Sequence, residues 1–211
     1  MLSALLSCVR WLVPVRTFAS ITTARPTPPP PWRRRAISPT SSGMRPGFAL
    51  MNLGGETPAS LGEPEPAALQ LADRWILSRL ARVNRETAER YGSYGLGEAA
   101  KGLYEFAWND VCDWYLELSK RRLNPGEAPS PEALADQRTA RQVLAKVISQ
   151  MHLMLHPLMP HLTEELWHSV TGAGETSFLA LQPWPVLDAA ALDDGLEAAF
   201  SELIAAIRVV R

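Results

Sequence analysis

The chain has little of what defines several protein classes. Its 211 residues include only two cysteines, Cys8 and Cys112, too few for the disulfide framework of a small secreted domain. It has no continuous apolar run of the roughly 20 residues that a membrane-spanning helix needs. It also has no convincing alternation of apolar and polar residues, which is the pattern of a half-buried strand. The sequence therefore predicts a reduced, intracellular protein with no membrane span and no sheet.

The first 45 residues contain no acidic side chain. They hold seven arginines and many Ser, Thr and Pro residues, a composition typical of an organelle transit peptide. Arg10 interrupts the apolar stretch that a secretory signal would need. Residues 16–20 resemble the Arg-x-Phe-Ala/Ser cleavage pattern of mitochondrial presequences, so we expect a mitochondrial protein, with the chloroplast as the alternative. The prolines of 26–31 and the arginines of 33–35 predict a disordered or extended linker.

Residues 46–211 are net acidic and have the apolar spacing of helices. They carry 22 acidic and 14 basic side chains, a balance that disfavours broad affinity for nucleic acid because phosphate binding needs a positive surface. Apolar residues recur with the helical period, and Gly and Pro residues separate the segments. The predicted helices are 67–91, 96–123, 131–157, 162–170 and a last segment from 196 to the end. We therefore expect an all-α fold, an antiparallel helical bundle behind a disordered leader.

Residues that could do chemistry are few. His152 and His156 have the i, i+4 spacing of a metal site, but Leu153 stands where the zincin pattern has its catalytic Glu. Their apolar neighbours favour histidines that border the core, and we expect no metal. Cys112 has only acidic and amide neighbours, which would not activate a thiol, so it is expected to be a packing residue. The sequence predicts no catalytic residue.

The second predicted helix carries two apolar or aromatic stripes. The first is expected to face the core and includes Leu103, Ala107, Trp114 and Leu118. A neighbouring stripe interleaves aromatic rings with cations: Lys101, Tyr104, Trp108, Tyr115, Ser119 and Arg122. Rings and cations in this arrangement can hold unpaired bases and their phosphates. Packing of the same rings on a neighbouring helix is the interpretation that periodicity alone favours, although it leaves both open.

Three segments resemble one protein family. They are 73–80 (Asp-Arg-Trp-Ile-Leu-Ser-Arg-Leu), 104–120 (with Cys-Asp-Trp-Tyr-Leu-Glu-Leu at its centre) and 155–167 (beginning Leu-His-Pro-Leu-Met-Pro-His). In this order they resemble the anticodon-binding domain of valyl-tRNA synthetases, class I aminoacyl-tRNA synthetases. The segments 48–55 and 203–211 also resemble the family. The resemblance therefore covers roughly residues 48–211, which we call the body of the chain. It implies a helical anticodon-binding domain at 67–211, with a partial first segment of that domain at 46–66 behind the leader at 1–45.

The resemblance implies a function in RNA binding without catalysis. It identifies the chain as a tRNA-binding module of a valine–tRNA ligase, and it makes Lys101, Trp108, Lys120 and Arg122 the candidate contacts to the anticodon loop. Nothing in the sequence resembles the His-x-Gly-His or Lys-Met-Ser-Lys-Ser signatures that bind ATP in the family. We therefore expect no cofactor in this chain, although complete family members use ATP and Mg²⁺. A separate catalytic chain is a possible partner, whereas DNA and membranes are not expected to be partners.

One departure from the family weakens the expected binding. The family enters this domain through Asn-Ala-Ser-Arg-Phe, and the aligned residues 44–48 read Met-Arg-Pro-Gly-Phe, so that only Phe48 remains. The lost Asn and Arg belong to an element that helps to hold the anticodon in related synthetases. We therefore expect weak binding of valine tRNA. The alternative function is a truncated helical module that binds proteins and has no RNA role.

Overall fold

The computed structural model describes residues 52–172, 177–186 and 188–210. The leader at 1–45, its cleavage pattern and the departure at 44–48 lie outside the described residues. The elements are α3 (Pro58–Leu61), η2 (Pro66–Ala68), α4 (Leu71–Gly92), α5 (Leu96–Glu105), η3 (Phe106–Tyr115), α6 (Leu116–Leu123), α7 (Pro131–Leu155), α8 (Pro160–Thr171), η4 (Leu179–Leu181), η5 (Ala189–Ala191) and α9 (Asp194–Val210). The described residues contain no strand, so the predicted all-α fold is confirmed.

Local sequence signals set the ends of the long helices. The backbone N–H of Gln70 donates to Asp73 at 3.0 Å, which closes the first turn of α4, so this helix begins at Leu71 and not at the predicted residue 67. Ser130 accepts a hydrogen bond from the backbone N–H of Ala133, and Pro131 fills the first position of α7. Gly172 ends α8 with φ of 63°, a left-handed conformation that glycine adopts without strain.

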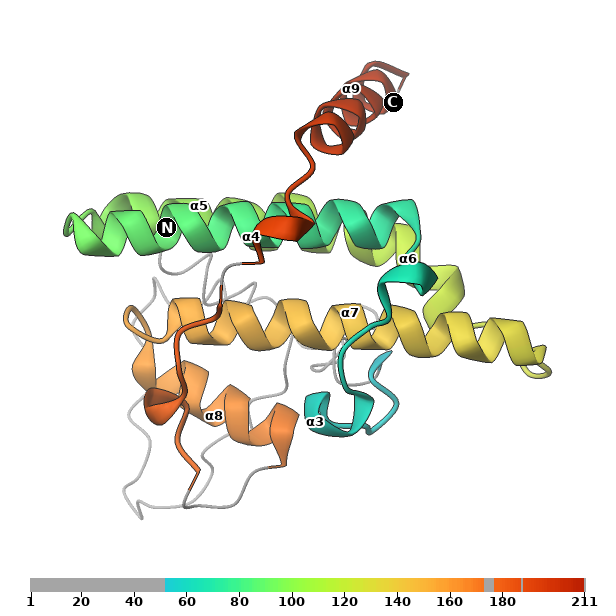
Figure 1. The fold of residues 1–211 in the computed structure, drawn as a ribbon, viewed down its shortest axis with the longest axis horizontal. Coiled ribbons are helices and arrows are strands. Elements are labelled where there is room, and N and C mark those ends of the chain that lie inside the picture. The colour runs from blue at the N-terminus through green and yellow to red at the C-terminus, as the bar shows by residue number, and fades with distance from the viewer. Residues whose placement is uncertain (1–51, 173–176, 187, 211) are drawn as a thin grey trace, which may run out of the picture.

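The helices stack in layers around one core (Figure 1). α4 packs against the continuous run of α5, η3 and α6, α7 lies beneath both, and α8 and α3 pack on α7. α9 contacts α4 and projects from the opposite side of that layer. Leu53 and Leu61, which precede the predicted helical domain, are buried in the same core. No helix within the described ranges is long and apolar enough to cross a membrane.

The second long helix changes its winding in the middle, and this shifts its buried face. η3 is a π-helix, whose i→i+5 hydrogen bonds wind the chain more loosely than the 3.6 residues per turn of an α-helix. One row of buried residues consequently recurs at every fourth position: Leu103, Ala107, Val111, Tyr115, Ser119 and Leu123, with Phe106 and Leu116 buried beside it. The predicted facing was therefore wrong after Ala107. Trp114 is only half-buried, Leu118 is exposed and Tyr115 lies in the core.

Candidate nucleic-acid interface

Trp108 and Tyr104 form an aromatic pair at the surface of the continuous run of α5, η3 and α6, which is called the long helix below. Their rings lie 6.5 Å apart between centroids with an interplanar angle of 14°, one turn apart along the helix. Trp108 keeps 42% of its surface exposed, and Tyr104 is half-buried against the core. The pair therefore offers a flat aromatic surface to solvent, as stacking on an unpaired base requires.

Two of the predicted cations lie at the surface beside acidic partners. Lys101 Nζ lies 3.8 Å from Glu105, and Lys120 Nζ lies 3.3 Å from Glu117, each within one turn. The two lysine side chains are 64% and 58% exposed, so these ion pairs are solvated and contribute little to stability. Both ammonium groups are accessible to a phosphate, although each would have to share its charge with a carboxylate.

Arg122 is engaged inside the protein. Its Nη1 donates to Asp73 Oδ1 at 2.8 Å and its Nε donates to Asp136 Oδ1 at 2.9 Å. Burial alone would lower the pKa of Arg122, but the hydrogen bonds to both carboxylates outweigh it and raise the pKa. Arg122 thus joins α6 to α4 and α7, and in this arrangement its guanidinium is not presented to a phosphate.

The remaining polar groups of the predicted aromatic stripe also face inward. Tyr115 is fully buried and donates its hydroxyl to Asp73 Oδ1 at 2.9 Å. Its pKa is raised well above the ordinary value, first by burial and then by the nearby Asp73 carboxylate. Ser119 is buried one turn further on. The predicted stripe therefore splits, with its first half at the surface and its second half in the core.

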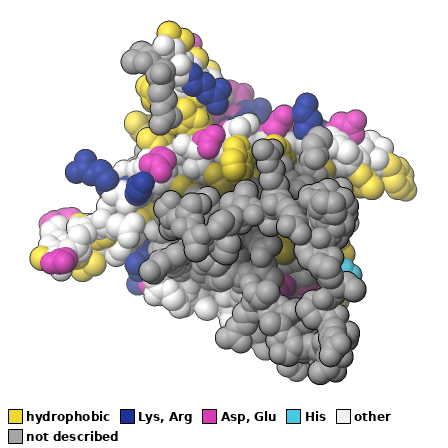
Figure 2. Space-filling view, turned by 180° about the vertical axis from the view of Figure 1, so that it is seen from behind, with side chains coloured by type: hydrophobic (Ala, Val, Ile, Leu, Met, Phe, Trp, Pro, Cys, Tyr) yellow, Lys and Arg dark blue, Asp and Glu magenta, His cyan; other side chains and the backbone are white. Residues whose placement is uncertain are grey.

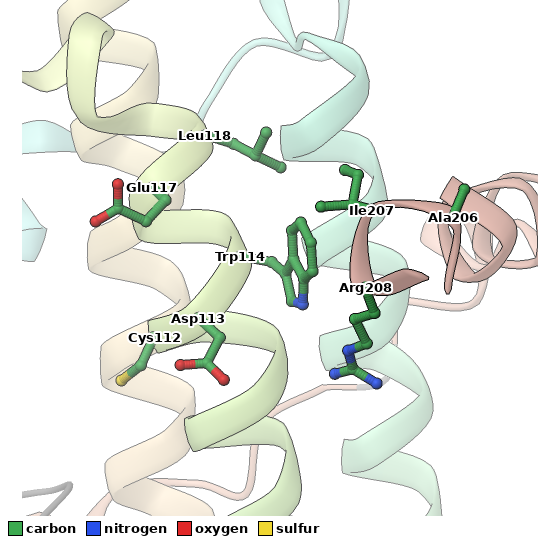
Figure 3. Close-up of a pocket in the computed structure, with 8 residues that line it drawn as sticks. All are labelled: Cys112, Asp113, Trp114, Glu117, Leu118, Ala206, Ile207 and Arg208. Atoms are coloured by element: carbon green, nitrogen blue, oxygen red, sulfur yellow. The ribbon is translucent and has the colours of Figure 1, made fainter. Parts of the chain in front are cut away.

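A groove of about 1000 Å³ lies between the long helix and the second half of α9 (Figure 3). Trp114 and Leu118 point across it toward Ile207, and Asp113 and Arg208 lie near the same end of the indole in this view. Cys112, Glu117 and Ala206 complete the lining. Sequence periodicity missed this site because it assigned Trp114 to the core.

Arg79 ties the two walls of this groove together. Its Nε donates to Asp110 on η3 at 2.9 Å and its Nη1 donates to Glu197 on α9 at 3.2 Å. Glu197 also accepts from Arg82 at 2.8 Å and from the buried Ser78 hydroxyl. Burial would raise the pKa of Glu197, but hydrogen bonds from Arg82, Ser78 and Arg79 leave it lowered, so the carboxylate is charged at neutral pH.

A stacked aromatic pair strengthens the attachment of α9. Phe200 lies on Trp75 of α4 with ring centroids 4.8 Å apart and an interplanar angle of 9°. Beyond this point the helix leaves Leu203, Ile207 and Val209 exposed. The first half of α9 is therefore anchored by charges and rings, and the second half forms the outer wall of the groove.

The two histidines with metal-like spacing have different environments. His152 is buried, and burial lowers its pKa from 6.5 to about 4. His156 lies at the end of α7, with its Nδ1 2.9 Å from the Thr163 hydroxyl. Within the part of the chain that the structure describes, no group of three or more His, Cys, Asp or Glu side chains is placed to hold a metal.

The visible surface charges are mixed. On the face seen from behind in Figure 2, the Lys and Arg side chains lie among Asp and Glu side chains and do not form one basic area. With 22 acidic and 14 basic side chains in residues 46–211, contacts between rings and bases would have to supply much of the affinity for an RNA.

The comparisons with known proteins are consistent with this geometry. The model of a family described as the anticodon-binding domain of tRNA ligase matches residues 73–211. The chain is 86% identical over 164 residues to the valine–tRNA ligase of Parasynechococcus marenigrum (strain WH8102) and 75% identical to that of Prochlorococcus marinus (strain MIT 9313). The valine–tRNA ligase of Thermosynechococcus vestitus (strain NIES-2133 / IAM M-273 / BP-1) is 51% identical over the same length.

The matches cover most of this chain but a small part of each relative. They span 78% of the chain and 18% of the length of the first two ligases, and 17% of the third. These relatives are cyanobacterial. Cyanobacterial relatives give no support to the expected mitochondrial location, and they agree with the alternative, a chloroplast-type origin.

Proposed function

The chain belongs to the anticodon-binding domain family of tRNA ligases, and we propose from this that its helical body binds the anticodon loop of a valine tRNA. The observation that carries the proposal is the stacked pair of Tyr104 and the exposed Trp108, on a helix inside the matched region. An unpaired base can extend such a stack, because every base has a flat π face. High identity to valine–tRNA ligases supports valine tRNA as the ligand.

The cations have different parts in this proposal. Lys101, about two turns before Trp108 on the same helix, is the candidate contact to a phosphate near the stacked base. Lys120 lies further along the helix run and would contact a more distant phosphate. Arg122 contributes indirectly, because its ion pairs with Asp73 and Asp136 hold the helix in place.

The proposed affinity is low and sensitive to salt. Each accessible lysine shares its charge with a glutamate, and the body as a whole is net acidic. We expect dissociation constants in the range of non-specific binding, roughly 10⁻⁴–10⁻⁶ M. Aminoacylation, with its ATP and Mg²⁺, is proposed to need the parts of a valine–tRNA ligase that this chain does not match, supplied as a separate catalytic chain.

The proposed location is a plastid. Cyanobacterial relatives and an acid-free, Arg- and Ser-rich first segment of 45 residues support it together. Expression of residues 1–45 fused to a fluorescent protein in plant cells tests it. Fluorescence in plastids is the expected result, and fluorescence confined to mitochondria contradicts the proposal.

A titration of the full chain tests the RNA proposal. Fluorescence anisotropy with valine tRNA and with one non-cognate tRNA is measured for the wild type, for Trp108→Ala and for Phe178→Ala. Phe178 is a matched control because it is 46% exposed and lies in a loop away from the long helix. We expect tighter binding of valine tRNA, about tenfold weaker binding by Trp108→Ala and no change with Phe178→Ala. Equal binding of both tRNAs with no effect of Trp108→Ala favours a protein-binding module instead.

A further inference from the structure

The groove between the long helix and α9 has an aromatic wall, an aliphatic wall and one charged group of each sign at its rim. The half-buried Trp114 forms the first wall, and Ile207 forms the second. Asp113 and Arg208 are the charged groups. We propose that this groove binds one unpaired RNA base that carries an exocyclic amino group, an inference that rests on the proposed function.

The two walls suit a flat ring. Trp114 presents its indole toward Ile207 across the groove, which has a volume of about 1000 Å³. A base that enters the groove can stack on the indole with one face and contact the aliphatic side chain with the other. Leu118, on the same wall, extends the apolar lining. Both walls are exposed enough to be reached from solvent, because Leu118 and Ile207 are exposed side chains.

The carboxylate of Asp113 selects the kind of base. Asp113 is exposed and has no partner among the described residues, whereas the other acid of the lining, Glu117, is bound to Lys120 at 3.3 Å. A carboxylate accepts hydrogen bonds only, so it pairs with an amino group such as that of cytosine. Uracil presents a carbonyl oxygen at the equivalent position, which a carboxylate repels. The groove therefore favours cytosine over uracil.

Arg208 supplies the contact to the backbone of the RNA. It is exposed on α9, it lines the same groove as Asp113, and it has no acidic partner in the described part of the chain. A guanidinium in this position can bind the phosphate next to the inserted base. This contact carries no base preference, so Asp113 and Arg208 have separable effects on binding.

The groove is held open before any ligand arrives. Arg79 links Asp110, one turn before Trp114, to Glu197 in the first half of α9. The stacking of Phe200 on Trp75 fixes α9 between this link and Ile207. Because the long helix and the first half of α9 are both fixed to α4, little of the site has to be assembled on binding, which lowers the entropic cost of capturing a base.

Short single-stranded oligomers of cytidine and of uridine test the proposal, because the two bases have the same ring size and differ at the amino position. Affinities for the full chain are measured by fluorescence anisotropy at several salt concentrations. We expect the wild type to bind oligocytidine several-fold more tightly than oligouridine. Asp113→Asn should bring this ratio close to one, since its amide can also donate to uracil. Asp188→Asn, a change of another exposed aspartate outside the groove, should leave the ratio unchanged.

Three further variants separate the stacking contact of Trp114 from the phosphate contact of Arg208. Trp114→Leu keeps an apolar side chain but removes the stacking surface, and it should weaken binding of both oligomers about tenfold, whereas Trp114→Phe should retain most of the affinity. Arg208→Gln should weaken both oligomers equally and reduce the slope of log affinity against log salt by about 1. Asp113→Asn and Arg208→Gln change exposed side chains, so their effects do not depend on the stability of Trp114 variants.

The outcomes distinguish this inference from the proposed function. If valine tRNA binds and Trp108→Ala weakens it, but the Trp114, Asp113 and Arg208 variants bind both oligomers like the wild type, the groove is not a base pocket and the proposed function stands. If the wild type binds neither tRNA nor oligomers, both are overturned. A wild-type preference for oligouridine contradicts the assignment of Asp113.

Discussion

Arg122 donates from Nη1 to Asp73 Oδ1 at 2.8 Å, with only 10% of the arginine side chain and none of the aspartate side chain exposed. The same carboxylate accepts the Tyr115 hydroxyl on Oδ1 and the backbone N–H of Gln70 on Oδ2. Asp73 thus closes the first turn of α4 and binds the long helix at two points. An arginine that looked like a phosphate ligand in the sequence is a structural cation.

Removing Arg122 should destabilise the fold severely. Arg122→Ala leaves the Asp73 carboxylate buried without its cation, and losing one partner of a buried pair costs roughly 3–5 kcal/mol. Urea denaturation followed by circular dichroism measures the change in unfolding free energy. Lys120→Ala is the matched control, because its ion pair with Glu117 is solvated and should contribute about 0–1 kcal/mol. Equal stability of the two variants would show that Arg122 is exposed in solution.

The Tyr115 hydroxyl provides a test of the π-helical winding. Tyr115→Phe removes the hydrogen bond to Asp73, and a buried hydrogen bond to a charged group contributes about 1.5–3 kcal/mol. Tyr104→Phe, at a half-buried position of the same helix whose hydroxyl has no hydrogen bond among the described residues, should change the unfolding free energy by a few tenths of a kcal/mol. The same denaturation experiment compares them. No effect of Tyr115→Phe would mean that Tyr115 lies outside the core, as the regular α-helical facing predicts.

The helices themselves could be predicted from the sequence. Gly and Pro separate them, and the predicted ranges for α7 and for the run from Leu96 to Leu123 agree with the structure to within two residues. The facing of the second run could not be predicted beyond Ala107, because an assumed period of 3.6 fails where the winding becomes π-helical. Tyr115 therefore lies in the core, where Trp114 was expected, and Trp114 is only half-buried.

The site could be predicted only in part, for a related reason. Trp108 is exposed as a base-stacking residue must be, and local spacing was enough to select it. The partners of Arg122 lie 49 and 14 positions away in the sequence, and those of Arg79 lie 31 and 118 positions away. Spacing within one helix carries no information about such contacts, so both the structural role of Arg122 and the groove beside α9 became visible only in the folded chain.

Glu197 should control the attachment of α9. Glu197→Gln removes the charge that Arg79 and Arg82 share, and we expect faster amide hydrogen exchange in α9 with unchanged exchange in α7. Because the pKa of Glu197 is lowered in the fold, its contribution is present above the ordinary carboxyl pKa and is lost as the pH falls through the lowered value. Glu202→Gln, an exposed change on the same helix, is the control. Protection of α9 that is equal in both variants contradicts the anchoring role.

His152 gives the fold a second dependence on pH, with a different window. It is buried on α7, its Nδ1 has no hydrogen-bond partner among the described groups, and burial lowers its pKa from 6.5 to about 4. The folded state therefore keeps the ring neutral, whereas the unfolded chain takes up a proton as the pH falls below 6.5. Stability is unaffected by this group above pH 6.5 and declines between pH 6.5 and about 4.

His152→Leu should remove this loss. A shift from 6.5 to about 4 corresponds to about 3 kcal/mol of unfolding free energy lost across that window in the wild type. Leucine has no proton to bind and leaves no unpaired polar atom, so the variant should be as stable as the wild type at neutral pH, or more stable, and markedly more stable at pH 4. Urea denaturation across the window measures this, with His161→Leu as the exposed control. If the wild type and His152→Leu lose stability in parallel as the pH falls, the imidazole is protonated inside the fold and is not buried as the structure shows.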